Sequence, residues 1–202
     1  MTDLLSVAQS AAFAAGKVLR EKYPQVRVIQ VKGVQDIVTD ADFAAQTAIV
    51  DVIKSHDPHA AILSEEGIEP DPQARLIWVV DPLDGTTNYA RRLPMFGTSI
   101  AAVQDGQPIA GAIYDPLRDL LFAAEIDRGA TLNGVPIHAS MTSEVRESIV
   151  GLDWGRGEAA RSIGLSWLQR TGTQVKSIRA IGSSALALCY IACGWIDIYF
   201  HA

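Results

Sequence analysis

Two N-terminal segments place their hydrophobic residues at helical spacing. In residues 3–23 leucines and alanines recur every three or four positions, and Asp3 is suited to cap the first turn. Residues 41–55 repeat the pattern up to Asp57-Pro58, which ends it. The residues of this second helix expected to face inward are Phe43, Ala48, Ile49, Val52 and Ile53.

Shorter apolar runs after the second helix predict strands. Residues 60–64 and 76–80 are continuous apolar runs, typical of buried strands. Residues 98–103 and 108–114 flank Asp105-Gly106, which is a strong hairpin signal. Further strands are expected over 120–125, 148–153 and 195–200, and further helices over 156–170 and 183–193. The pattern predicts an α+β chain with an antiparallel-rich sheet.

The composition is that of a globular chain. Its 202 residues are 49% hydrophobic and 20% charged, which fits one domain with a sizeable core. The net charge of −6 does not favour a nucleic-acid-binding surface. Cys189 and Cys193 lie in an apolar helical segment and are expected to be reduced thiols. The start of the chain carries no basic leader and the longest apolar run is short of roughly 20 residues, so we expect a cytoplasmic protein without a membrane span.

The most informative segment runs from Trp78 to Asn88 and reads Trp-Val-Val-Asp-Pro-Leu-Asp-Gly-Thr-Thr-Asn. An apolar strand stops at Asp81, and a second carboxylate, Asp84, precedes a Gly-Thr turn. Carboxylates are rarely buried unless they are paired or bind a metal. Mg²⁺ takes one or two carboxylates together with waters and substrate oxygens. The order indicates a divalent-metal phosphate site, although Asp-Pro and Asp-Gly also occur in simple surface turns.

Two acidic clusters lie upstream of this segment. Residues 61–66 form another apolar run that ends in carboxylates, the first of them Glu65. Residues 36–42 read Asp-Ile-Val-Thr-Asp-Ala-Asp and precede the second helix. Short polar side chains at a helix start also accept hydrogen bonds from its unpaired N–H groups, so capping by Thr39 or Asp40 is an alternative reading. Capping does not require all of these residues.

Taken together, these motifs resemble the inositol monophosphatase family of the lithium-sensitive, magnesium-dependent phosphatase superfamily. Upstream, the resemblance rests on Lys32 with residues 36–42, on the two glutamates after the strand, and on Asp-Pro-Leu-Asp-Gly-Thr-Thr-Asn at 81–88. Downstream, residues 181–194 and 197–200 match as well. The resemblance runs from the first helix to the last residue, and several motifs in the same order make it specific.

The resemblance implies a layered α/β/α/β/α sandwich, with residues 1–202 as a single inositol-monophosphatase-like domain. In relatives the chain continues beyond the Tyr-Phe of the last strand and supplies a Trp-Asp dipeptide whose Asp completes the second metal site. Here the sequence stops at His201-Ala202. We therefore expect a C-terminally incomplete version of this domain, with a shortened family member as the alternative.

The resemblance also implies a metal centre with two or three Mg²⁺ ions, which Li⁺ is expected to inhibit. Glu65, Asp81 and the backbone carbonyl of Leu83 would bind the first ion. Asp81 and Asp84 would bind the second, together with the carboxylate expected further along the chain. Carboxylate and carbonyl oxygens are the ligands that a hard cation prefers.

The resemblance assigns the chemistry to residues beside these ligands. Gly85 and Thr86 would donate backbone N–H groups to the phosphate, as helix N-termini do. The hydroxyl of Thr86, oriented by Asp42, would activate the attacking water. Glu65 belongs to this catalytic group as well as to the metal ligands. The implied reaction is metal-assisted hydrolysis of a phosphate monoester.

The substrate is implied less sharply than the reaction. Asp84, Ser184 and His201 match positions that line the polyol side in relatives. The expected substrate is inositol monophosphate or a similar small polyol or sugar phosphate, and because His201 replaces an acidic residue there, strict specificity for inositol is not expected. A broader sugar (bis)phosphatase such as a fructose-1,6-bisphosphatase is one alternative. A non-catalytic interaction protein is another, because some bacterial relatives serve in RNA-polymerase-associated complexes. A homodimer is expected, and a nucleic-acid partner is not.

Overall fold

The computed structural model describes residues 3–25, 28–33, 36–155 and 157–201. Residue 156, where the helix expected over 156–170 begins, lies outside the described residues. The chain divides into two units, residues 1–136 and 137–202, and each is described by itself. The expectation of a single domain over 1–202 stays a prediction.

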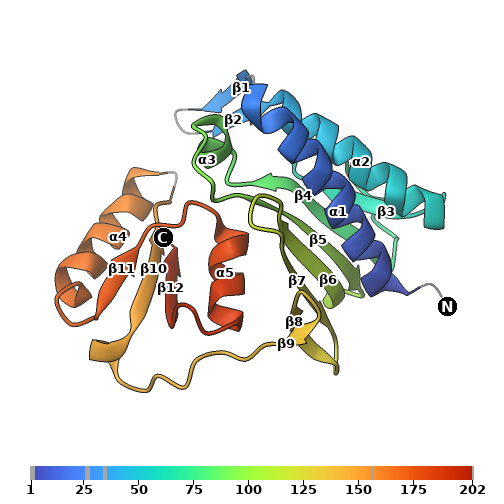
Figure 1. The fold of residues 1–202 in the computed structure, drawn as a ribbon. Helices are drawn as coiled ribbons and strands as arrows, with labels where there is room; N and C mark the ends of the chain where they lie inside the picture. The colour runs from blue at the N-terminus through green and yellow to red at the C-terminus, as the bar shows by residue number, and fades with distance from the viewer. Residues whose placement is uncertain (1–2, 26–27, 34–35, 156, 202) are drawn as a thin grey trace. The chain divides into compact units, whose positions relative to one another are not determined.

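The first unit begins with the two predicted helices, α1 (Leu4–Lys22) and α2 (Asp40–His56). They lie side by side over one face of a sheet (Figure 1). Asp3 caps α1, since its Oδ1 accepts a hydrogen bond from the N–H of Ser6 at 3.2 Å. Thr39 caps α2 through a hydrogen bond from the N–H of Ala41 at 3.2 Å, which confirms the capping prediction for this residue.

The sheet beneath these helices has seven strands in the order β3-β4-β5-β6-β7-β8-β9. Its strands are β3 (Ala61–Ser64), β4 (Leu76–Asp84), β5 (Gly97–Gln104), β6 (Gln107–Asp115), β7 (Leu120–Glu125), β8 (Gly129–Leu132) and β9 (Val135–Pro136). β3 is parallel to β4, and every later pair is antiparallel. The predicted hairpin at Asp105-Gly106 is confirmed, and both residues have the positive φ that its tight turn requires.

Small residues let α1 approach the sheet closely. Its buried face consists largely of alanines, and Gly16 lies against the ring of Tyr114, where an added Cβ would stand 2.4 Å from ring carbons. On α2 the buried apolar stripe runs through Ala41, Ala45, Ile49 and Ile53, at intervals of four residues. The inward orientation expected of Phe43 is therefore wrong: its side chain is 39% exposed.

A 3-10 turn and two short strands connect α1 to α2, and a short helix, α3, follows β4. β1 (Val28–Gly33) pairs with β2 (Asp36–Thr39) in an antiparallel ribbon that leads directly into α2. A 3-10 turn, η1 (Tyr23–Gln25), ends α1. Helix α3 (Thr86–Ala90) follows β4 immediately, so the segment from β4 to α3 contains the whole central motif.

The second unit contains a three-stranded parallel sheet in the order β11-β10-β12. Its elements are η2 (Val145–Glu147), β10 (Ile149–Asp153), α4 (Glu158–Thr171), β11 (Ser177–Arg179), α5 (Ser184–Ala192) and β12 (Ile198–His201). The chain moves from β10 to one neighbour and then crosses to the other, so right-handed connections put α4 and α5 on opposite faces of the sheet; Figure 1 shows this arrangement. Among the described residues, no helix has the length and apolar character needed to cross a bilayer.

Candidate functional site

An irregularity in β4 places Asp81 and Asp84 on the same side of the chain. Asp81 pairs with Ser99 of β5 and Asp84 pairs with Gly97, so β4 advances three residues while β5 advances two. In a regular strand, side chains three residues apart point to opposite faces of the sheet. The extra residue of a bulge shifts this alternation by one position, so that the two side chains point to the same face. A proline is tolerated within a strand at such a bulge, and Pro82 lies there. β4 therefore extends to Asp84 and not only to the predicted residue 80.

The parallel pairing of β3 with β4 brings Glu65 to this bulge. Ser64 pairs with Val80, and the N–H of Glu65 donates to the Val80 carbonyl at 3.3 Å. The Glu65 side chain is exposed and lies close enough to Asp81 to influence its pKa. Burial raises the pKa of Asp81 above its usual range, and the charges of Asp84 and then Glu65 raise it further. The structure therefore brings these three predicted ligands into one electrostatically coupled group.

The oxygen donors of this group suit a hard divalent cation. Among the residues that the structure describes, no group of three or more His, Cys, Asp or Glu side chains is arranged so that it could hold a metal ion. The three carboxylates influence one another's charge, yet they do not form a complete ligand set. Both observations are consistent with a site in which the protein supplies only part of the metal's coordination sphere. Mg²⁺ is typically bound in that way, through one or two carboxylates, waters and substrate phosphate oxygens. Asp81, Asp84 and the carbonyl of Leu83 offer such a partial set.

A turn at the end of β4 orients the Leu83 carbonyl and Thr86. The N–H of Leu83 donates to Asp81 Oδ1 at 3.1 Å, and its side chain is buried in the core. Gly85 follows with φ 90° and ψ 35°, a left-handed conformation that favours glycine. The chain then enters α3, and Thr86 Oγ1 lies 3.0 Å from the Leu83 carbonyl. Gly85 and Thr86, whose backbone N–H groups are predicted to bind the phosphate, come directly after Asp84 in the sequence.

Asp42 reaches the same place from the start of α2. Its Oδ2 accepts hydrogen bonds from the N–H of Thr39 at 2.8 Å and from the Thr39 hydroxyl at 2.5 Å, which completes a capping box. Its Oδ1 lies 3.4 Å from Thr86 Oγ1. Burial raises the pKa of Asp42 to about 6, opposed by the hydrogen bonds from Thr39. Asp42 and Thr86 are thus adjacent although 44 positions separate them in sequence.

The two remaining predicted site residues, Ser184 and His201, belong to the second unit. Ser184 is the first residue of α5, and its Oγ lies 3.0 Å from the hydroxyl of Tyr199. The Tyr199 hydroxyl also lies 3.1 Å from Oδ2 of the buried Asp153. His201 is exposed and its ring stacks on Tyr199, with centroids 6.3 Å apart. Lys32 and Asp36, also part of the resemblance, have side chains outside the described set.

The topology of the second unit gives these residues a common location. In open parallel sheets, ligands bind at the carboxyl ends of strands where the strand order reverses, and that reversal occurs here at β10. Asp153 ends β10 and pairs with His201 at the end of β12. Sequence reasoning overlooked Asp153 and Tyr199, although Asp153 shows the same signal as Asp81: a carboxylate that ends a buried apolar strand.

Comparison with known proteins identifies the family. The family model described as "Inositol monophosphatase family" matches residues 1–202. The chain is 35% identical to "Nus factor SuhB" of Salmonella typhimurium, with 100% of this chain and 77% of the relative covered. It is 34% identical to "Inositol monophosphatase 2" of Solanum lycopersicum, covering 100% of this chain and 78% of the relative.

Solved structures confirm the predicted layered α+β fold class. The inositol monophosphatase from Anabaena (Nostoc) superposes with a TM-score of 0.85 at 34% identity, covering 98% of this chain and 74% of that one. The expectation of a further segment with another metal-binding Asp stays a prediction. The family match over the whole sequence, the identity to relatives and the shared fold lead to one conclusion: the chain belongs to the inositol monophosphatase family.

Proposed function

We propose that this chain is a Mg²⁺-dependent phosphomonoesterase that hydrolyses inositol monophosphate or a similar small polyol or sugar phosphate. The observation that carries the proposal is the coupled carboxylate group of Asp81, Asp84 and Glu65 beside the Thr86–Asp42 pair. Phosphoryl transfer needs positioning and charge neutralisation more than covalent chemistry by the protein, and this group supports both. Family membership supports a phosphatase and a phosphorylated small-molecule substrate.

Two or three Mg²⁺ ions would be held by Glu65, Asp81, Asp84 and the Leu83 carbonyl, together with the carboxylate expected further along the chain. Bound Mg²⁺ supplies positive charge to the phosphate and makes a neighbouring water more acidic. The charges of Asp84 and Glu65 both raise the pKa of Asp81, which supports the expectation from the resemblance that Asp81 contributes to both ion positions. Neutralising Asp81 would therefore weaken the whole group.

The Thr86 hydroxyl has one proton and two acceptors within reach, the Leu83 carbonyl at 3.0 Å and Asp42 Oδ1 at 3.4 Å. When the Leu83 carbonyl is engaged as a ligand, Asp42 is the acceptor that remains. The lone pairs of Thr86 Oγ1 are then free to accept a proton from the attacking water, and Asp42 can take the Thr86 proton in turn. The pKa of Asp42, raised by burial to about 6, brings this carboxylate toward the range in which a general base works at neutral pH.

The phosphate and polyol contacts complete the proposal. Gly85 and Thr86 would donate backbone N–H groups to the phosphate, and Asp84 would contact a substrate hydroxyl. Ser184 and His201 would contact the polyol, a role favoured by their place at the carboxyl ends of a parallel sheet. Because His201 is not an acid, we expect tolerance for several polyol phosphates.

Phosphate release from inositol 1-phosphate by the full-length protein, with any segment that follows residue 202, across a Mg²⁺ titration tests the proposal. Fructose 1,6-bisphosphate serves as a second substrate, and separate reactions contain excess EDTA or Li⁺. Asp71→Asn is a matched control for Asp81→Asn, because Asp71 is an exposed aspartate in a turn, where its Oδ1 accepts from the N–H of Gln73 at 2.9 Å. We expect Mg²⁺-dependent, Li⁺-inhibited turnover that Asp81→Asn abolishes and Asp71→Asn preserves. Turnover that survives both EDTA and Asp81→Asn would contradict the proposal.

A second candidate function comes from the name of a relative. The Salmonella typhimurium relative is named a Nus factor, which favours a non-catalytic interaction protein of the same fold. This alternative predicts no turnover of either substrate at any Mg²⁺ concentration. The same titration of the full-length protein, with any segment that follows residue 202, therefore decides between the two candidates. Homodimer formation and a cytoplasmic location remain predictions, which size measurement and cell fractionation would test.

A further inference from the structure

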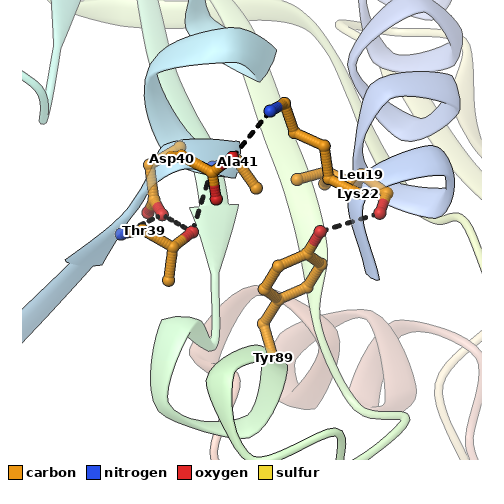
Figure 2. Close-up of polar contacts among 7 residues, drawn as sticks. Leu19, Lys22, Thr39, Asp40, Ala41 and Tyr89 are labelled. Atoms are coloured by element: carbon orange, nitrogen blue, oxygen red, sulfur yellow. Dashed lines mark hydrogen bonds and ion pairs between the residues drawn. The ribbon is translucent and has the colours of Figure 1, made fainter. Parts of the chain in front are cut away.

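The last turn of α1 is tied to both elements that carry the Thr86–Asp42 pair. Figure 2 shows the two ties: the hydroxyl of Tyr89 points to the backbone carbonyl of Leu19, and the amine of Lys22 points to Asp40. Tyr89 belongs to α3, which begins at Thr86, and Asp40 begins α2, which carries Asp42. None of these four residues belongs to the site described above.

The tie from α3 is a buried hydrogen bond. Tyr89 is fully buried, and its hydroxyl donates to the Leu19 carbonyl at 2.8 Å. Its ring lies 4.8 Å from that of Phe96, edge to face, and 5.3 Å from that of Tyr23. Burial, then the charges of Asp40 and Asp42, raise the pKa of Tyr89 well above its usual value. The hydroxyl therefore remains a donor throughout the physiological pH range, and both carboxylates lie close enough to influence it.

The tie from α2 joins two helix ends of opposite polarity. Lys22 is the last residue of α1, and its Nζ lies 2.7 Å from Asp40 Oδ2 at the first residue of α2. A cation is favourable at a helix C-terminus and an anion at an N-terminus, so each charge also suits its own helix. The two side chains are 37% and 30% exposed, so the pair is partly shielded from solvent.

Helix α3 needs an anchor of this kind. It has five residues, and a helix this short does not hold its orientation by its own hydrogen bonds. Its N-cap is Gly85 in a left-handed conformation, without a side-chain capping hydrogen bond. The hydrogen bond from Tyr89, three residues after Thr86, to the Leu19 carbonyl therefore restrains the direction in which the Thr86 hydroxyl points. Asp42, two residues after Asp40, is restrained in the same frame.

We propose that Tyr89 and Lys22 are positioning residues that anchor α3 and α2 to the end of α1 and so hold the Thr86 hydroxyl beside Asp42. The inference rests on the proposed phosphatase function for its kinetic consequence, while its structural consequence is independent of that function. Neither residue needs to touch the substrate. Both act by fixing the distance between the two side chains that do the proton transfer.

Single-atom and single-charge changes test the inference. Tyr89→Phe removes only the hydroxyl, and Tyr114→Phe is its matched control, because Tyr114 is also buried, also packs against α1 and donates to Asp119 at 2.6 Å. Lys22→Met removes the charge, and Arg75→Met is its control, because Arg75 pairs with Asp105 at 2.6 Å. The readouts are kcat and KM for inositol 1-phosphate, and hydrogen–deuterium exchange of the Mg²⁺-free protein.

We expect Tyr89→Phe to lower kcat about 10-fold with KM within about twofold, in line with the effect of partners that orient active residues. Exchange should rise in peptides covering residues 84–91 and 39–43 and not elsewhere. Lys22→Met should act in the same direction but more weakly, because its ion pair is partly exposed. Both control variants should retain wild-type kcat and wild-type exchange in these peptides.

The outcomes separate this inference from the proposed function. A wild-type protein without turnover refutes the proposed function, and local exchange in Tyr89→Phe still decides whether the anchor exists. Wild-type kcat and unchanged local exchange in Tyr89→Phe would overturn the positioning role. If Tyr89→Phe unfolds, Lys22→Met carries the same test through its own kcat and exchange, with wild-type values overturning the inference.

Discussion

Replacing Thr86 by alanine separates chemistry from metal binding. The Thr86 hydroxyl lies 3.0 Å from the Leu83 carbonyl and 3.4 Å from Asp42 Oδ1, and it is not one of the predicted metal ligands. Removing a positioned proton-transfer group typically slows a reaction about 10²–10⁴-fold. That factor corresponds to about 3–5 kcal/mol in the activation barrier, at about 1.36 kcal/mol per tenfold change. Losing one ordinary hydrogen bond costs only about 0.5–1.5 kcal/mol of stability.

The assay for Thr86→Ala combines three measurements on one preparation. Phosphate release gives kcat, a Mg²⁺ titration of that rate gives the apparent metal affinity, and thermal unfolding gives the stability change. Thr86→Ser is the control, because it keeps the hydroxyl and loses only a methyl group. We expect a large loss of kcat in the alanine variant alone, with metal affinity nearly unchanged. A metal affinity that falls in parallel with kcat would refute the reasoning and make Thr86 mainly a ligand.

Three further predictions follow from the geometry. Asp81→Asn should abolish turnover and raise the Mg²⁺ concentration needed for any residual rate, and a normal Mg²⁺ titration would contradict its shared position. Gly16→Ala should lower Tm, because its Cβ would overlap the Tyr114 ring at 2.4 Å and overpacking costs about 1–3 kcal/mol; a raised Tm would contradict this. The hydrogen bonds from the Ser140 hydroxyl and then the Ile149 N–H lower the pKa of Asp197. The ionised Asp197 carboxylate therefore stabilises the folded state above its unfolded-state pKa, about 3.9, and this stabilisation is lost as the pH falls through the folded-state pKa. Below pH about 4, Tm should consequently fall more steeply with decreasing pH in the wild type than in Asp197→Asn.

The local elements were predictable because their signals are local. The spacing of alanines and leucines gave α1, and Asp105-Gly106 gave the hairpin between β5 and β6. The orientation of Phe43 was not predictable, since hydrophobicity alone does not say which of two adjacent apolar stripes on α2 faces the sheet. That choice depends on the alanines at 41 and 45, whose small size lets the helix pack closely.

The site was predictable in its residues and not in its geometry. Carboxylates at the ends of apolar strands marked Asp81 and Glu65, because a charge beside a buried strand requires a reason, although Glu65 itself is exposed. The bulge between Asp81 and Asp84 was hidden, because Asp-Pro-Leu-Asp has the composition of a turn although it continues β4. In the second unit, the contact from Tyr199 to Asp153 was also hidden, because it joins residues 46 positions apart.

The capping box at the start of α2 shows that folding and proposed chemistry use the same carboxylate. Thr39 supplies both hydrogen bonds to Oδ2 of Asp42, while Oδ1 faces Thr86. Helix capping and catalysis therefore do not compete for the same lone pairs. The two hydrogen bonds fix the carboxylate plane, and this plane determines the direction in which Oδ1 presents its lone pairs. Reading the cluster at 36–42 either as a helix cap or as part of an active site was thus a false choice, since the cap orients the side chain that the proposed chemistry requires.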